Sequence, residues 1–357
     1  MVEKKLEKII FKQDLDRLFE ESLKDFTVYG PIEKKGNIVF EKIDKSDNLK
    51  LNYLNSKIPP KSVIFPQTET LFEYEKKDDE IIFKESNNVG KKRIIFGIRP
   101  CDAHSFTLLE TFFSFGKFED DLFLKKRENT ILIGIGCNTP KNTCFCTSVN
   151  GHPFKDDDVD IFLVDLTEKY LVTPISDRGK ELIEGISWLN NANKNDLKKS
   201  VELANNAESA IETNLNLDNI SEKLDNNFYN SLWKEISEVC IGCGTCAFLC
   251  PTCHCFDVID EEDHYNNRGR RVRIWDTCQF PLYTLHTSGH NPRSSRIQRC
   301  RNRILHKFCY YPQNYDLIGC VGCGRCIQYC PVNNDIRVIL DKFQKLSEEE
   351  EEKLLVA

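Results

Sequence analysis

Cys240-Ile-Gly-Cys243-Gly-Thr-Cys246-Ala-Phe-Leu-Cys250-Pro251 has the same spacing as Cys320-Val-Gly-Cys323-Gly-Arg-Cys326-Ile-Gln-Tyr-Cys330-Pro331. Both stretches are C-x2-C-x2-C-x3-C-P, the spacing that holds cubane [4Fe–4S] clusters. Three thiolates on one short loop reach three irons, and the fourth cysteine, followed by Pro, leaves toward the other cluster. Two copies of the motif predict two clusters.

The crossing of the fourth cysteine predicts two ligand sets. One cluster is held by Cys240, Cys243, Cys246 and Cys330, and the other by Cys250, Cys320, Cys323 and Cys326. Zinc sites use two C-x2-C pairs, without a third thiolate and a C-P step. The motifs therefore indicate an electron-carrying iron–sulfur protein rather than a zinc protein used for assembly.

Composition narrows the class of protein. A chain of 357 residues with 40% hydrophobic and 29% charged residues has room for two globular domains. Its seventeen cysteines are an odd number, and reduced thiolates that bind metal indicate a cytoplasmic protein rather than a secreted disulfide framework. No signal peptide or membrane span is expected, and the net charge of −7 argues against nucleic-acid binding.

Periodicity predicts an α+β protein. Residues 1–25 have the pattern of an amphipathic helix, and a second helix is expected at Ala103–Phe115, capped by Asp102. Apolar runs of strand length occur at Asn37–Ile43, Ser62–Pro66, Arg93–Ile98, Thr130–Ile135 and Asp160–Leu166. We expect an N-terminal α/β domain over 1–225, with a helical connector at its end. A mainly helical ferredoxin-like domain over 226–357 would follow, with a long insertion between the two motifs.

Further segments carry a resemblance to a known family. In the C-terminal half they are Cys250-Pro-Thr-Cys-His-Cys-Phe-Asp, Gly269-Arg-Arg-Val-Arg-Ile-Trp-Asp-Thr-Cys278, Ser288-Gly-His-Asn-Pro-Arg293 and His306-Lys-Phe. In the N-terminal half they are Phe96-Gly-Ile-Arg-Pro-Cys-Asp102 and Gly136-Cys-Asn-Thr-Pro-Lys-Asn-Thr-Cys-Phe-Cys146. They resemble iron–sulfur subunits such as the sulfhydrogenase beta subunit and the anaerobic sulfite reductase A subunit.

The resemblance implies a subunit that relays electrons. Its partners would be a flavin- and NAD(P)H-binding oxidoreductase subunit and a hydrogenase, sulfite reductase or heterodisulfide-reductase-like subunit. The chain has no G-x-G-x-x-G and no G-x4-G-K-[ST] motif, so we expect the flavin on another polypeptide. The alternative is a stand-alone iron–sulfur oxidoreductase with Cys101 or a cluster at its active site.

Four N-terminal cysteines suggest a third cluster. Cys101 and Cys137 each follow an expected strand, and Cys144 and Cys146 lie shortly after Cys137. Thiolates gathered at one sheet edge would repel one another unless a cation neutralised them. A structural role for these cysteines and a reactive Cys101 thiolate at the helix N-terminus are the alternatives.

The insertion adds two groups of residues with open roles. Cys253, Cys255 and Cys278 either pack around a cluster or bind a metal, with His254, Cys300 or Cys309 as a fourth ligand. The arginines form a positive group around the clusters or a docking surface, or, for Arg296–Arg303, a solvated helix face. They are Arg268, Arg270, Arg271, Arg273, Arg293, Arg296, Arg299, Arg301 and Arg303.

Overall fold

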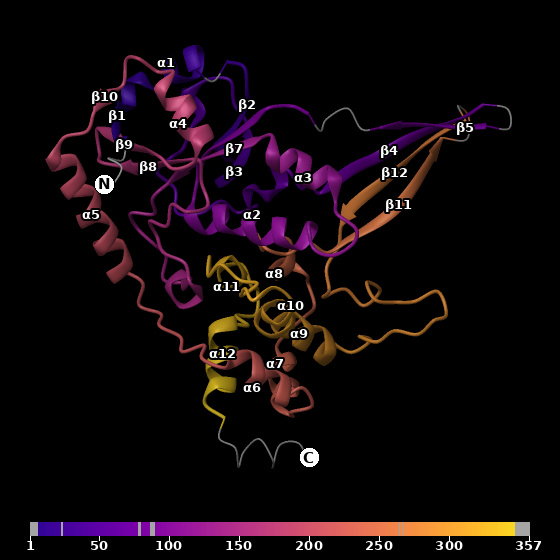
Figure 1. Ribbon diagram of the computed structural model, residues 1–357. Coiled ribbons are helices and arrows are strands. Elements are labelled where there is room, and N and C mark those ends of the chain that lie inside the picture. The colour runs from indigo at the N-terminus through magenta and orange to yellow at the C-terminus, as the bar shows by residue number, and fades with distance from the viewer. Residues whose placement is uncertain are drawn as a thin grey trace. The chain divides into compact units, whose positions relative to one another are not determined.

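The computed structural model describes residues 6–346, except residues 23, 78–79, 86–89, 264 and 266. The chain folds as two compact units (Figure 1). The first unit contains residues 1–66 and 87–212, and the second contains residues 67–86 and 213–357. Both units contain helices and strands, so the fold is α+β as predicted. Among the described residues, no helix has the length and apolar content of a membrane span.

An eight-stranded sheet forms the centre of the first unit. Its order is β10-β1-β9-β8-β7-β6-β2-β3, and the strands from β2 through β6 and β7 to β8 run parallel. All residues of β6 and β7 are buried, which is typical of strands in the middle of a parallel sheet. The strands are β1 (Lys8–Phe11), β2 (Thr27–Lys34), β3 (Asn37–Lys42), β6 (Arg93–Ile98), β7 (Thr130–Ile135), β8 (Ile161–Asp165), β9 (Lys169–Pro174) and β10 (Asn190–Asn191).

Helices cover both faces of this sheet (Figure 1). Helices α2 and α3 pack against β7, and α4 and α5 pack against β9. An apolar core joins the sheet to α1 and α4 through Leu15, Phe96 and Ile183. The helices are α1 (Leu15–Arg17), α2 (Pro100–Phe113), α3 (Asp121–Glu128), α4 (Asp177–Glu184) and α5 (Lys194–Ser209).

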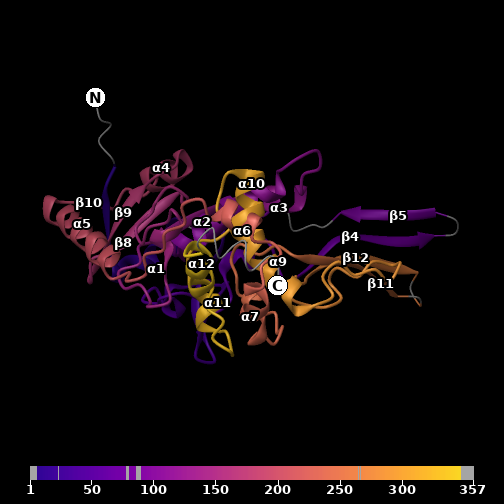
Figure 2. The same ribbon diagram turned by 90° about the horizontal axis from the view of Figure 1, so that it is seen from below.

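The second unit combines short helices with a four-stranded antiparallel sheet, which the two views show as an extended ribbon (Figure 2). The sheet order β11-β12-β4-β5 brings together two hairpins from distant parts of the sequence. Trp233 of α7 is buried and stacks on Phe343 of α12 with ring centroids 4.4 Å apart. The strands are β4 (Thr68–Lys77), β5 (Glu80–Glu85), β11 (Phe256–Asp263) and β12 (Arg268–Trp275). The helices are α6 (Ile220–Asn226), α7 (Leu232–Glu238), α8 (Thr245–Phe248), α9 (Arg296–Leu305), α10 (Tyr311–Tyr315), α11 (Arg325–Gln328) and α12 (Ile336–Gln344).

Several local predictions were wrong. The expected N-terminal helix is interrupted, because Lys8–Phe11 pairs as β1 with β9 and β10; residues 1–5 and 23 of that prediction lie outside the described part. The expected strand at Ser62–Pro66 is not formed, since Pro60–Val63 makes a 3-10 turn that starts at a proline. Asp102 is not the cap of α2: the helix begins at Pro100, and the buried Asp102 lies inside its first turn.

The two compact units differ in extent from the domains expected from composition. Residues 67–86 join the second unit because β4 pairs with β12 along seven positions. The first unit ends at Glu212, within the segment expected to be a connector. The division into 1–225 and 226–357 stays a prediction about independently folding domains.

Candidate iron–sulfur centre

The two motif loops have the same backbone conformation. In the first loop Gly242 and Gly244 have φ of 70° and 75°, and in the second loop Gly322 and Gly324 have φ of 62° and 71°. Glycine adopts this left-handed region at little cost, so the backbone can turn twice between neighbouring cysteines. Gly244 and Gly324 then begin the short helices α8 and α11, which pack against each other. The repeated sequence therefore produces a repeated structure.

The first predicted ligand set lines one cavity. Cys240, Cys243 and Cys246 of the first motif border it together with Cys330 of the second; Cys326 and Cys300 border it as well, so the two motifs contribute to the same space. Backbone N–H groups point at two of these sulfurs: Gly242 donates to Cys240, and Asn334 donates to Cys330 over 3.3 Å. Such N–H···S hydrogen bonds stabilise thiolate ligands and raise the potential of a cluster that they hold.

The second predicted set gathers around Cys250 of the first motif. Burial raises the pKa of both Cys320 and Cys326, and the negative charge of neighbouring sulfurs adds to the rise. These neighbours are Cys250 and Cys323 for Cys320, and Cys320, Cys323 and Cys250 for Cys326. The N–H of Gly322 donates to Cys320 over 3.5 Å, matching the Gly242 bond of the first loop. The structure thus brings Cys250 to the cysteines of the other motif.

Two buried cations lie among these thiols. Arg303 of α9 and Lys307, on the π-turn that follows it, are 7% and 2% exposed. The Lys307 ammonium donates to the Thr252 hydroxyl at 2.7 Å and to the Gly319 carbonyl at 3.0 Å. Both of these acceptors are neutral groups. Although burial alone would lower it, the pKa of Lys307 is raised because the Cys250 thiolate and the Cys253 sulfur that donates to it are close.

Arg303, like Lys307, is a buried cation whose pKa is raised by nearby cysteines. Burial lowers its pKa, but the nearby sulfurs of Cys246 and Cys253 have the opposite effect, and the net result is a raised pKa. Its guanidinium lies 3.6 Å from the Cys253 sulfur. A buried cation requires compensating negative charge, which a cluster held by four thiolates supplies. The cavity, the N–H···S bonds and the buried cations therefore fit [4Fe–4S] clusters, which supply one-electron redox chemistry when bound.

Lys307 and Thr252 were not predicted as functional residues from the sequence. The sequence does contain one indication of a buried, functional lysine, because Lys307 lies inside the largely apolar run Ile304-Leu-His-Lys-Phe-Cys309. A lysine on the buried side of a helix needs a partner, and here the partners come from the two motif regions.

Four of the five remaining cysteines of the second unit form hydrogen-bonded pairs with one another or with the motif cysteines, and the fifth, Cys309, interacts with Ser221. Cys300 donates to Cys240, and Cys253 donates to Cys250. Cys255 donates to Cys278, which lowers the pKa of Cys278 to about 6. Within the described part of the chain, no three His, Cys, Asp or Glu side chains converge on a single metal ion. Ligands of a cubane bind different irons, so this observation concerns mononuclear sites such as the metal site considered for Cys253, Cys255 and Cys278.

Two of the four N-terminal cysteines follow neighbouring strands of the first unit, and the other two lie in the loop beyond them. Cys101 is in the first turn of α2 after β6, and Cys137 follows β7, which pairs in parallel with β6. Cys144 and Cys137 act on Cys146, whose pKa is raised to about 12, mainly by burial. Burial also raises the pKa of Cys137, while the charge of Arg99 opposes that rise. Cys137, Cys144 and Cys146 are therefore neighbours, and Cys101 lies at the same edge of the sheet as Cys137.

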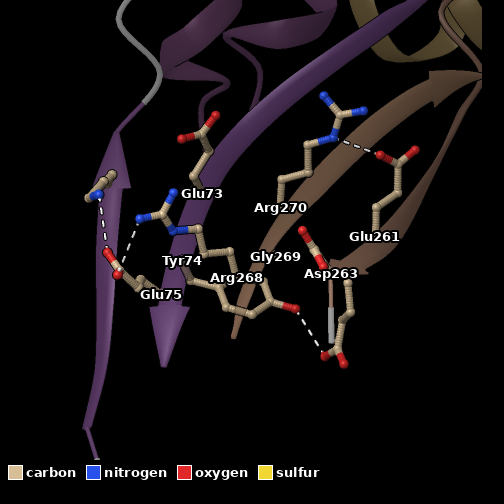
Figure 3. Close-up of a pocket in the computed structure, with 10 residues that line it drawn as sticks. Glu73, Tyr74, Glu75, Glu261, Asp263, Arg268, Gly269 and Arg270 are labelled. Carbon is tan, nitrogen blue, oxygen red and sulfur yellow. Dashed lines mark hydrogen bonds and ion pairs between the residues drawn. The ribbon is translucent and has the colours of Figure 1, made fainter. Parts of the chain in front are cut away.

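Most of the arginines in the insertion have partners within the second unit. Arg270 pairs with Glu261 at 2.6 Å and Arg268 with Glu75 at 3.5 Å across the sheet, around a charged hollow (Figure 3). Arg271 and Arg273 pair with Asp260 and Glu69. These four therefore balance acidic side chains instead of surrounding a cluster. The alternative of a solvated helix face for Arg296–Arg303 holds only in part, since Arg296 is exposed but Arg299 and Arg303 are buried.

Comparison with known proteins agrees with this geometry. Residues 239–334 match a family model described as a 4Fe-4S dicluster domain. The sulfhydrogenase 2 subunit beta of Pyrococcus furiosus is 31% identical over 319 residues, which cover 89% of this chain and 92% of that protein. No solved structure gave a significant match. The chain therefore belongs to the sulfhydrogenase beta subunit family and carries iron–sulfur clusters in a dicluster domain.

Proposed function

We propose that the chain relays electrons in a cytoplasmic oxidoreductase complex. One partner would be a flavin subunit that oxidises NAD(P)H, and the other a subunit that reduces a terminal acceptor. Since the relative is named a sulfhydrogenase subunit, a hydrogenase is the preferred second partner, ahead of sulfite reductase or heterodisulfide-reductase-like subunits. The electron donor, the acceptor and the direction of flow depend on those partners.

The observation that carries the proposal is the exchange of cysteines between the motifs. Cys330 lines the cavity of the first motif, and Cys250 interacts with Cys320 and Cys326 of the second. We assign Cys240, Cys243, Cys246 and Cys330 to one cluster and Cys250, Cys320, Cys323 and Cys326 to the other. Two clusters linked through shared loops lie close together, which suits electron transfer along the chain rather than substrate chemistry.

We also propose a third cluster at Cys101, Cys137, Cys144 and Cys146. The support is that half-buried Cys137 and buried Cys146 interact, with Cys144 beside them, where thiolates without a compensating cation would be costly. In the full reconstituted chain, iron content should fall by about four per molecule in Cys137→Ala, the content of one cubane. An unchanged iron content would remove the third cluster from the proposal.

Purification of the affinity-tagged chain from its native host under anaerobic conditions tests the function. We expect a flavin-containing subunit and a hydrogenase or reductase subunit to copurify. The complex should oxidise NAD(P)H, whereas the isolated chain should not. NAD(P)H oxidation by the isolated reconstituted chain would instead establish the stand-alone oxidoreductase.

A further inference from the structure

Cys255 and Cys278 form a thiol pair outside both motifs. Cys255 directly precedes β11 and Cys278 follows β12, and these strands pair with Phe256 opposite Trp275. The N–H of Asp276 donates to the Cys255 carbonyl at 3.0 Å, which extends the hairpin to its base. The two side chains hydrogen-bond to each other there.

The backbone that carries Cys278 is held firmly. Gln279 is 2% exposed and its side-chain amide donates to the Arg299 carbonyl at 2.9 Å. The same amide lies 3.6 Å from the Cys278 sulfur, and the hydroxyl of Thr277 accepts from the Gln279 N–H at 3.2 Å. On the other side, the Tyr283 hydroxyl donates to Cys255. These contacts fix two thiols side by side, and no third metal ligand joins them among the residues that the structure describes.

The pair lies next to the proposed clusters. The charge of Cys278 acts on Cys246, a proposed ligand of the first cluster. Cys255 is five residues beyond Cys250, a proposed ligand of the second. Arg303 lies close to both Cys278 and Cys246. Electrons from either cluster therefore have a short path to this pair.

We propose that Cys255 and Cys278 form a redox-active dithiol that exchanges two electrons with the two clusters. On oxidation, the two sulfurs form one S–S bond, and Cys255 releases to solvent the one proton that it donates to the Cys278 thiolate. Two electrons leave, one to each cluster, and reduction reverses every change. This inference rests on the proposed function, because the clusters serve as electron acceptor and donor. It gives the chain a site that converts one-electron steps into a two-electron step.

Differential alkylation of the full reconstituted chain tests the pair. The protein is equilibrated in dithiothreitol buffers of graded redox poise, quenched in acid, labelled with one iodoacetamide isotope, reduced and labelled with a second. We expect Cys255 and Cys278 to change label together and to appear as a single disulfide-linked peptide. Buried Cys309, which contacts Ser221 instead of another thiol, should keep one label throughout.

Coulometric titration of the same samples adds a second measurement. Cys255→Ser and Cys278→Ser should each accept about two fewer electrons per chain than the parent protein, as expected for loss of a dithiol couple. Their cluster EPR signals should persist, and Cys309→Ser should behave like the parent. An equal electron count in all four proteins, or a disulfide that joins Cys253 instead, would overturn the inference.

Iron analysis separates failure of the inference from failure of the proposed function. A chain loaded with both clusters but lacking the Cys255–Cys278 disulfide at every poise refutes the dithiol alone. A chain that forms the disulfide yet binds no iron supports the thiol pair and refutes the iron–sulfur relay.

Discussion

The two cysteine loops share ligand spacing and backbone conformation but differ in their surroundings. Ile241 in the first loop is 59% exposed, whereas Val321 at the same position of the second loop is 4% exposed. Cys243 is exposed and its counterpart Cys323 is buried. Where the first loop has Thr245, the second has the fully buried Arg325.

This difference indicates that the two similar sites have different roles in electron transfer. Burial, hydrogen bonds to sulfur and nearby charge set the potential of a cluster, so equal ligands in unequal surroundings give unequal potentials. The exposed first loop is the expected place for electron exchange with a partner subunit. The buried second loop lies next to Lys307, and we expect its cluster to pass electrons within the protein instead of exchanging them directly with a partner.

The largest expected effect comes from breaking the exchange of cysteines. Cys250→Ser should remove the EPR signal of the cluster on the Cys320 loop, and Cys330→Ser that of the cluster on the Cys240 loop. Each change removes one of four ligands from the opposite motif's cluster. Cys309→Ser, a buried cysteine outside both sets, serves as the control. If each variant lost only the signal of its own motif, the pairing would be wrong.

Loss of the buried Lys307 charge should alter the second cluster more than the first. Lys307 acts on Cys250 and Cys320, and positive charge favours the more negative reduced cluster. Lys307→Met should therefore lower the potential of the second cluster by roughly 60 mV, a tenfold change for a one-electron couple. Lys342→Met, which removes a partly exposed lysine paired with Glu235, should leave it unchanged. Equal shifts of both clusters in an EPR-monitored titration would contradict the assignment.

Iron removal should follow the exposure of the loops. A chelator reaches the first cluster through Cys243, while the second is surrounded by buried Cys250, Cys320 and Cys323. The signal of the first cluster should therefore decay several-fold faster when EPR follows both in the same sample. Faster loss of the second cluster would reverse the proposed order of the two sites.

The smallest expected effect is a cost in backbone strain. Gly244→Ala places a methyl group at φ of 75° and about 3.0 Å from Phe280 and Thr277. Thermal unfolding should show that the free energy of unfolding falls by at least about 1 kcal/mol, the usual cost of a non-glycine residue in the left-handed region. Gly185→Ala at the end of α4, with neighbours at 3.6 Å and no positive φ, is the matched control. A similar cost at both glycines would mean that the loop conformation is not the source.

Local sequence patterns predicted the parts of the fold that depend on neighbouring residues. The apolar runs that became β3, β6, β7 and β8 have the length and composition of strands, and the motif loops carry their glycines and cysteines in order. The ribbon of β4, β5, β11 and β12 was missed. Its two hairpins are far apart in sequence, and charged pairs such as Arg270 with Glu261 replace an apolar pattern.

The same reasoning explains what was missed at the candidate site. Ligand spacing is local, so the cysteine sets follow from the sequence through a known geometric rule. The position of Lys307 against Thr252 and Gly319 depends on how α9 and its π-turn meet both motif regions. The pairing of Cys255 with Cys278 depends on the register of β11 and β12, which neither segment encodes alone.

The most direct test is the iron and acid-labile sulfide content of the full chain, purified and reconstituted without oxygen, with EPR of the reduced protein. The account predicts at least about eight irons and about eight sulfides per molecule, the content of two cubanes, together with signals from two interacting clusters. Fewer than about eight irons, or zinc without sulfide, would contradict it.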